Sequence, residues 1–174
     1  MIIYARPNKT GVRTSVVNRV WRWKDERGRG MATISQLANK RLKSIGPKAS
    51  ITSAAKTMRT ARIGSLFVKK GKQLVGIVTD TDIVRRAVAS GKPLGKLTVE
   101  KIMTTPICTI EGSQSVDDAQ DMMADLGVRH LGVTKNGEIM GIVSVRNLLL
   151  HYKRYAQSKI SQEMGYSEPK ISQD

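Results

Sequence analysis

The stretch Gly76-Ile77-Val78-Thr79-Asp80-Thr81-Asp82 decides the fold of this chain. An apolar run ends at Thr79, and a helical pattern over residues 83–88 follows at once. Hydroxyl and carboxylate residues of this kind cap helices. The free N–H groups at the helix start, with the helix dipole behind them, favour phosphate, and the Asp82 carboxylate can accept hydrogen bonds from ribose hydroxyls. An ordinary capped turn explains the stretch equally well, so the rest of the chain must decide.

The same pattern returns 65 residues later. Gly141-Ile142-Val143-Ser144 aligns with Gly76-Ile77-Val78-Thr79, and Asn147 stands where the first copy has Asp82. Three further pairs of segments align at the same spacing without a gap: 33–37 with 98–102, 50–54 with 115–119, and 63–68 with 128–133. This spacing is longer than the period of most solenoid repeats, and two copies indicate a paired domain.

Each copy predicts a β-α-β-β-α unit. Short extended segments are expected at 42–45 and 107–110, and helices capped by Ser50 and Ser115 follow them. In the first of these helices the predicted apolar face holds Ile51, Ala54, Ala55 and Met58. Two strands (66–69 and 74–79 in the first copy) form a hairpin, and in the second copy Asn136-Gly137 is a strong tight-turn signal. A closing helix ends near Gly91.

The composition excludes several classes of protein. A single cysteine among 174 residues excludes an internal disulfide framework, and together with two histidines it argues against a structural zinc site. No apolar run approaches the roughly 18 residues of a membrane span, and the start lacks the apolar centre of a secretory signal, so we expect a cytoplasmic protein.

The net charge of +16 is unevenly distributed. It is +6 over residues 1–30, +12 over 31–97, −3 over 98–150 and +1 over 151–174. This asymmetry predicts either an anionic partner for the basic half or pairing of unlike halves between two chains.

The duplicated β-α-β-β-α unit, with G-h-h-[ST]-x-x-D at its last strand–helix junction, resembles a tandem pair of CBS domains over about residues 33–150. The resemblance implies an α/β (α+β) fold in which two units pack as a pseudo-two-fold pair. The domains would be a basic extension (1–30), a first repeat (31–92), a second repeat (93–150) and a tail (151–174). It also implies a sensor, not an enzyme, that binds AMP, ADP, ATP or another adenosyl ligand between the repeats. No cofactor or metal is required, and Mg²⁺ would enter only with ATP.

The resemblance assigns the ligand to two clefts, each built from one junction and the opposite repeat. In the main cleft Thr79 would face phosphate, Asp82 the ribose, and Arg129 and His130 the phosphate groups. The complete main set is Ile77, Thr79, Asp82, Thr105, Pro106, Ile107, Val128, Arg129 and His130, with Ile107 and Val128 flanking the adenine. Asp80 and Thr81 are interpreted as plain capping residues.

The second cleft is predicted to be the weaker one, because the neutral amide of Asn147 replaces the carboxylate. Its set is Arg41, Leu42, Ile63, Gly64, Ser65, Ile142, Ser144, Arg146 and Asn147. Lys40 and Lys43 are near in sequence and add positive charge. Arg146 is expected either to reach phosphate or to be solvated.

The structure of residues 1–30 and the function both keep alternatives at the level of sequence. Residues 1–30 are a loosely attached extension, a packed helix with Val12, Val16, Val20 and Trp23 on one face, or a basic arm for nucleic acid; Met31 is a candidate start. The alternative function is therefore a nucleic-acid-binding protein that uses this arm and the first repeat. A third hypothesis is a structural adaptor with empty clefts. We expect a homodimer with unlike halves together, a protein partner of unknown identity, and no membrane.

Overall fold

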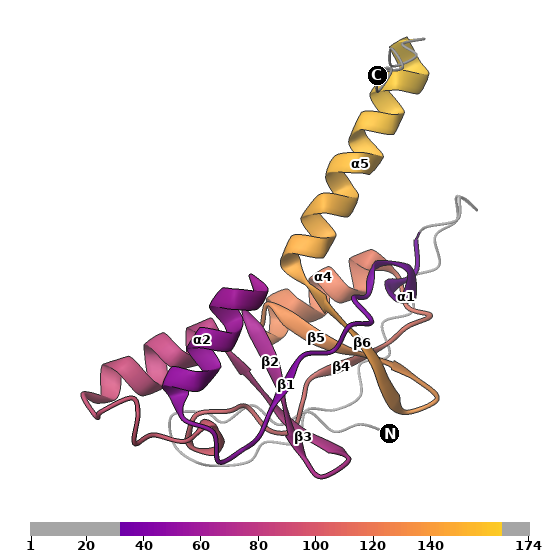
Figure 1. The fold of residues 1–174 in the computed structure, drawn as a ribbon. Helices are drawn as coiled ribbons and strands as arrows, with labels where there is room; N and C mark the ends of the chain where they lie inside the picture. Colours follow the sequence, from indigo (N-terminus) through magenta and orange to yellow (C-terminus); the bar gives the residue numbers. More distant parts are fainter. Residues whose placement is uncertain (1–31, 165–174) are drawn as a thin grey trace, which may run out of the picture.

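The computed structural model describes residues 32–164, and in these residues it confirms the expected α+β fold with two three-stranded sheets (Figure 1). The first sheet consists, in spatial order, of β1 (Ser44–Ile45), β2 (Ser65–Lys70) and β3 (Gln73–Thr79). The second consists of β4 (Thr109–Glu111), β5 (His130–Lys135) and β6 (Glu138–Ser144). The predicted extended segments at 42–45 and 107–110 are therefore correct in place, but they form strands of only two and three residues.

Each sheet joins one parallel pair to one antiparallel hairpin. β1 and β4 run parallel to β2 and β5, and the hairpins pair Leu66 with Val78 and Leu131 with Val143. Asn136 and Gly137 have φ values of 54° and 82°, as a two-residue hairpin turn of the primed type requires. The registers of the two hairpins coincide at the 65-residue spacing, so the duplication seen in the sequence is a duplication of structure.

Helices α2 (Ile51–Ala61) and α4 (Val116–Leu126) begin where the serines predict. The side chain of Ser50 accepts a bond from Ser53 N, and Ser115 accepts one from Asp118 N. The buried stripe of α2 is Ile51, Ala54 and Met58. The prediction that Ala55 belongs to this face is wrong: Ala55 is exposed, because the sheet covers only the narrow stripe at i, i+3 and i+7.

The closing helices of the two repeats differ. In the first repeat α3 (Asp80–Asp82) passes into a π-helical segment, η1 (Ile83–Ala87), and a 3₁₀ turn, η2 (Val88–Ser90), before Gly91 ends the run at φ 68°. The prediction of a single regular helix there is wrong, because the segment consists of these three short helical pieces. In the second repeat α5 (Val145–Met164) is one helix of 20 residues that extends well beyond the body of the molecule (Figure 1).

Two short segments cross between the repeats. α1 (Ile34–Leu37) lies at the start of the first repeat, yet Ile34 is buried in the core of the second. The 3₁₀ segment η3 (Val99–Lys101) lies near the start of the second repeat, yet Val99 and Ile102 are buried in the core of the first. The first core contains Ile51, Ala54, Met58, Leu66, Val68, Val78, Ala87, Val99 and Ile102. The second contains Ile34, Ile110, Val116, Ala119, Met123, Leu131, Val133, Val143 and Leu148.

The predictions for residues 1–30, including the apolar face with Val12 and Trp23, lie outside the described residues, as does the tail beyond Met164. Within the described part of the chain, no helix is both long enough and apolar enough to span a bilayer.

Candidate ligand clefts between the repeats

Both strand–helix junctions form a reciprocal capping box. Asp82 Oδ2 accepts bonds from Thr79 N at 2.9 Å and from Thr79 Oγ1 at 2.7 Å, while Thr79 Oγ1 accepts from Asp82 N at 3.2 Å. Asn147 Oδ1 accepts in the same way from Ser144 N at 2.9 Å and Ser144 Oγ at 2.6 Å. The amide oxygen thus reproduces the role of the carboxylate at the helix start, and the two junctions differ chiefly in charge.

The motif glycines let the opposite repeat approach these junctions. A Cβ on Gly76 would lie 2.9 Å from Thr104 O, and a Cβ on Gly141 would lie 2.9 Å from Ala38 Cβ. The backbone of Ile77 exchanges two hydrogen bonds with Thr104, at 3.0 and 2.8 Å. Ile142 exchanges two with Asn39, at 3.1 and 2.9 Å. The strand before each junction is therefore hydrogen-bonded to a segment of the opposite repeat.

At the predicted Asp82 cleft, whose predicted residues are the main set above, side chains of the two repeats meet. Arg129 Nη2 donates to Asp80 Oδ1 at 2.8 Å and also contacts Thr81 Oγ1. Asp80 and Thr81 are thus more than capping residues: they join the first repeat to the second. Sequence reasoning missed this contact because a residue type suited to capping carries no signal of a partner 49 residues away.

The electrostatics of this cleft are set by carboxylates as much as by cations. Asp82 Oδ1 lies 3.3 Å from Arg86 Nε, so both of its oxygens have partners. Burial lowers the pKa of His130, although the nearby carboxylates of Asp80 and Asp82 oppose this shift. Burial therefore disfavours the charged imidazolium of His130 in the ligand-free protein.

The other predicted members of the Asp82 cleft occupy varied positions. Thr105 and Pro106 are exposed beside the segment that pairs with Ile77. Ile107 lies against Gly132, and Val128 packs on the core of the second repeat.

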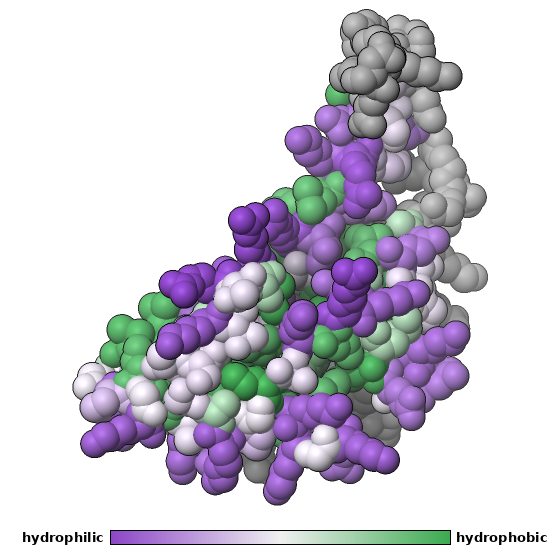
Figure 2. All heavy atoms as spheres, in the orientation of Figure 1, coloured by the Kyte–Doolittle hydropathy of each residue, from purple (hydrophilic) through white to green (hydrophobic). Residues whose placement is uncertain are grey.

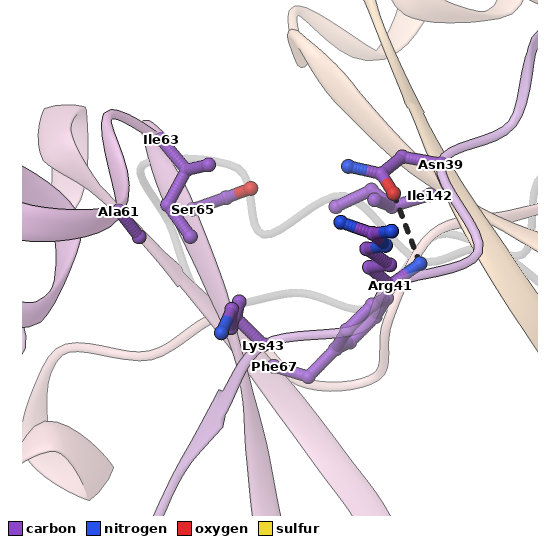
Figure 3. A pocket seen from close by; sticks show the side chains of 8 residues that line it. All are labelled: Asn39, Arg41, Lys43, Ala61, Ile63, Ser65, Phe67 and Ile142. Atoms are coloured by element: carbon purple, nitrogen blue, oxygen red, sulfur yellow. Dashed lines mark hydrogen bonds between the residues drawn. The ribbon is translucent and has the colours of Figure 1, made fainter.

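The Asn147 cleft, related to the first by the 65-residue spacing, contains a cavity of about 210 Å³ (Figure 3). Arg41, Asn39 and Ile142 lie on one side and face Ile63 and Ser65 across it (Figure 3). The full lining is Asn39, Arg41, Lys43, Ala61, Ile63, Ser65, Phe67 and Ile142. Four of the predicted residues thus line the cavity (Arg41, Ile63, Ser65 and Ile142). Leu42, Gly64, Ser144, Arg146 and Asn147 do not.

An alternation in the sequence accounts for this difference. The lining residues 39, 41 and 43 are spaced by two, as are 63, 65 and 67, while Ala61 reaches the cavity from the end of α2. In extended chain such residues share one face, so contiguous predictions such as Ile63-Gly64-Ser65 necessarily include a residue that points away. Gly64 faces Asp80 instead, whose Oδ2 would lie 3.0 Å from a Cβ at that position. The period of two was the signal for Asn39, Lys43 and Phe67.

No group of three or more potential metal-ligating side chains occurs in residues 32–164. The clefts offer hydrogen-bonding groups, apolar walls and charge, which are suited to binding an organic ligand.

Comparison with known proteins agrees with this geometry. The model of the CBS domain family matches twice, over residues 34–89 and 99–154. An uncharacterized 17.7 kDa protein of Acidianus ambivalens is 40% identical over 121 residues, which cover 68% of this chain and 72% of the relative. The crystal structure of an uncharacterized conserved protein from Pyrococcus horikoshii is similar with a TM-score of 0.68 and 30% identity, covering 71% of this chain and 94% of that one.

A third similarity concerns a structure with ligands. The CBS domain pair of protein MJ0100, in complex with 5′-methylthioadenosine and S-adenosylmethionine, has a TM-score of 0.65 and 24% identity. The similarity covers 72% of this chain and 99% of that one.

Proposed function

Because this chain belongs to the CBS domain family and its two repeats form one pair, we propose that it is a regulatory module that binds an adenosyl ligand between the repeats and performs no chemistry. An adenine nucleotide (AMP, ADP or ATP) is the leading candidate. Ligand binding would change the association of this protein with itself or with a protein partner.

The observation that carries the proposal is the cavity between the repeats. Seven of its eight lining residues come from the first repeat and Ile142 comes from the second. They combine apolar side chains (Ile63, Phe67 and Ile142) with basic ones (Arg41 and Lys43). Small-molecule sites typically pair apolar walls with a few placed polar groups. The ligands of the MJ0100 pair, both adenosyl compounds, support the choice of ligand class.

Isothermal titration calorimetry of the full chain tests the proposal. The titrants are AMP, ADP, ATP, 5′-methylthioadenosine and S-adenosylmethionine, and we expect at least one to bind. Guanosine monophosphate is the control for the base. The proposal fails if none of the five adenosyl compounds binds at millimolar concentration.

We also propose that Asp82 contacts the ribose hydroxyls in its cleft, whereas Asn147, which does not line the cavity of the other cleft, contributes less to ligand binding. Asp82→Asn gives the first junction the residue of the second and retains the acceptor oxygen of the capping box. Loss of a charge-assisted bond should weaken a phosphate-free ligand such as 5′-methylthioadenosine by about ten-fold. Asn147→Ala should affect this ligand less, and equal effects of the two variants would contradict the predicted order of the clefts.

Nucleic-acid binding remains the alternative, and one feature of the described residues favours it. Lys69, Lys70 and Lys72 are all exposed around the β2–β3 turn of the first repeat. Binding dominated by phosphate contacts weakens steeply as salt rises. A mobility-shift series from low to high salt decides the matter: no shift of any nucleic acid at low salt excludes this alternative.

A further inference from the structure

The two clefts are matched position by position at the 65-residue spacing, yet their charges differ. Arg41 and Lys43 of the Asn147 cleft correspond to Pro106 and Cys108 of the Asp82 cleft. Where the Asp82 junction carries the carboxylates of Asp80 and Asp82, the other carries Val145 and Asn147. The cations of the Asn147 cleft therefore face no carboxylate at its junction.

The cations of the two clefts also differ in availability. Arg129, the predicted phosphate contact of the Asp82 cleft, is engaged by Asp80 and Thr81 of the opposite repeat. Arg41 and Lys43 are exposed, and no carboxylate of residues 32–161 forms an ion pair with either side chain. An incoming phosphate would compete with the Asp80 carboxylate for Arg129, whereas it would meet no such competitor at Arg41 and Lys43.

The shape of the Asn147 cleft suits the same division. Its volume of about 210 Å³ is below the roughly 300–1,000 Å³ of a site that encloses a drug-sized ligand. The cavity would therefore enclose only part of a nucleotide and leave the rest at its exposed rim. The apolar side chains of Ile63, Phe67 and Ile142 provide walls for a planar base. A base and ribose held there would place the phosphate groups at the exposed side chains of Arg41 and Lys43.

We propose that the Asn147 cleft is the phosphate-selective site, in which Arg41 and Lys43 bind the phosphate groups of an adenine nucleotide. The Asp82 cleft, with its carboxylates, accepts the adenosyl group of a ligand without phosphate. This inference rests on the proposed function. It reverses the predicted order of the clefts for phosphorylated ligands while leaving that order in place for phosphate-free ones.

Calorimetry with AMP and adenosine on the full chain tests the inference. The wild-type protein should bind AMP at least about ten-fold more tightly than adenosine. The double variant Arg41→Gln/Lys43→Gln should lose this preference for AMP. Its affinity for AMP should fall by about ten-fold or more, whereas its affinity for adenosine should change by less than about two-fold. Lys72→Gln, which removes a positive charge at the distant hairpin turn, is the matched control and should leave both affinities unchanged.

Arg129→Gln decides between the clefts. If phosphate binds in the Asn147 cleft, this variant lowers the affinity for AMP far less than the double variant does. The inference is overturned if Arg129→Gln produces the larger loss, or if wild-type protein binds adenosine as tightly as AMP. In both of those cases the proposed function survives, since an adenosyl ligand still binds. If neither compound binds, nor any of the other adenosyl titrants, the proposed function fails and the inference fails with it.

Discussion

Asp82 and Asn147 show how one side chain can serve both the fold and a ligand site. Each accepts two hydrogen bonds from the residue three positions earlier, so each is part of its own helix start. An oxygen acceptor is required for the fold, but a negative charge is not. Charge at this position is therefore free to differ between the repeats, as the proposed division of ligands between the two clefts requires.

The glycines of the two motifs lead to a prediction about stability. Gly76→Ala should destabilise the protein by about 1–3 kcal/mol, because the added methyl group would lie 2.9 Å from the carbonyl oxygen of Thr104. Urea unfolding followed by circular dichroism measures the change. Gly46→Ala is the control, since nothing lies within 4 Å of a Cβ at Gly46. Equal stabilities of the two variants would contradict the close approach of the repeats.

His130 leads to a prediction about pH. Burial lowers its pKa in the folded protein, whereas the unfolded chain takes up the proton near the ordinary value of about 6.5. The unfolded state therefore binds more protons as pH falls below that value, and the folded state loses stability. We expect a lower free energy of unfolding at pH 5.5 than at pH 7.5, with a smaller difference in His130→Gln. A difference of the same size in both proteins would exclude His130 as its source.

At the scale of the element, the serine caps of α2 and α4 allow a matched comparison. Ser115→Ala removes the acceptor for Asp118 N and the hydroxyl that donates to Asp118 Oδ2. It should cost about 1–2 kcal/mol of stability. Ser50→Ala also removes an acceptor (for Ser53 N) and a donor, but this donor bonds the neutral hydroxyl of Ser53 and not a carboxylate, so the variant should cost less. Thermal or urea unfolding of the two variants tests this order, which a larger loss for Ser50→Ala would reverse.

The elements that the sequence predicts well are those with local causes. Both serine caps, the Asn136-Gly137 turn and the hairpins follow from residue type and short spacing, and the structure confirms them. The π-helical η1 was not predictable, because the sequence from Ile83 to Ala87 holds no proline or glycine to indicate a break. The Arg129–Asp80 ion pair was not predictable either, since it depends on how the two repeats dock.

The candidate clefts show the same limit. Their assignment to opposite repeats came from the family resemblance, and the lining of the cavity in the Asn147 cleft includes residues from both. The individual residues were predicted as contiguous triplets, although an extended chain presents alternate side chains to one face. The sequence also could not predict which basic side chains have a carboxylate partner, because the pairing of Arg129 with Asp80 depends on how close the two repeats lie.

At the scale of the whole molecule, exposed apolar side chains support the predicted homodimer. Val84 and Leu149, which are equivalent at the 65-residue spacing, are 61% and 64% exposed, and Val88 is 53% exposed. Figure 2 shows that apolar side chains reach the surface on the face that it draws. Val84→Glu and Leu149→Glu should each shift the protein toward monomer in light scattering. Gln73→Glu, on an exposed hairpin position, should not, and a wild-type monomer would refute the prediction.

The orientation of such a dimer follows from charge. Helix α2 carries Lys56 and Arg59 but no acidic residue, whereas α4 carries four aspartates and no basic residue. Dimers with unlike repeats together should be favoured, because like repeats would bring charges of one sign together. Asp121→Lys should therefore weaken the dimer, and adding Lys56→Asp should restore it. Failure of the second change to restore association would argue for like repeats in contact.

The crossing of α1 and η3 means that the molecule is, in effect, a fused dimer of half-length chains. Ile34 completes the core of the second repeat and Val99 that of the first, so each half lends the other a piece that it lacks on its own. In a chain of one repeat, the segment that packs into the opposite core would have no core to enter. A second copy of that chain could supply one if the two copies exchanged these segments. The joined halves should consequently unfold in one cooperative step, and a ligand that steadies one cleft also steadies the other half.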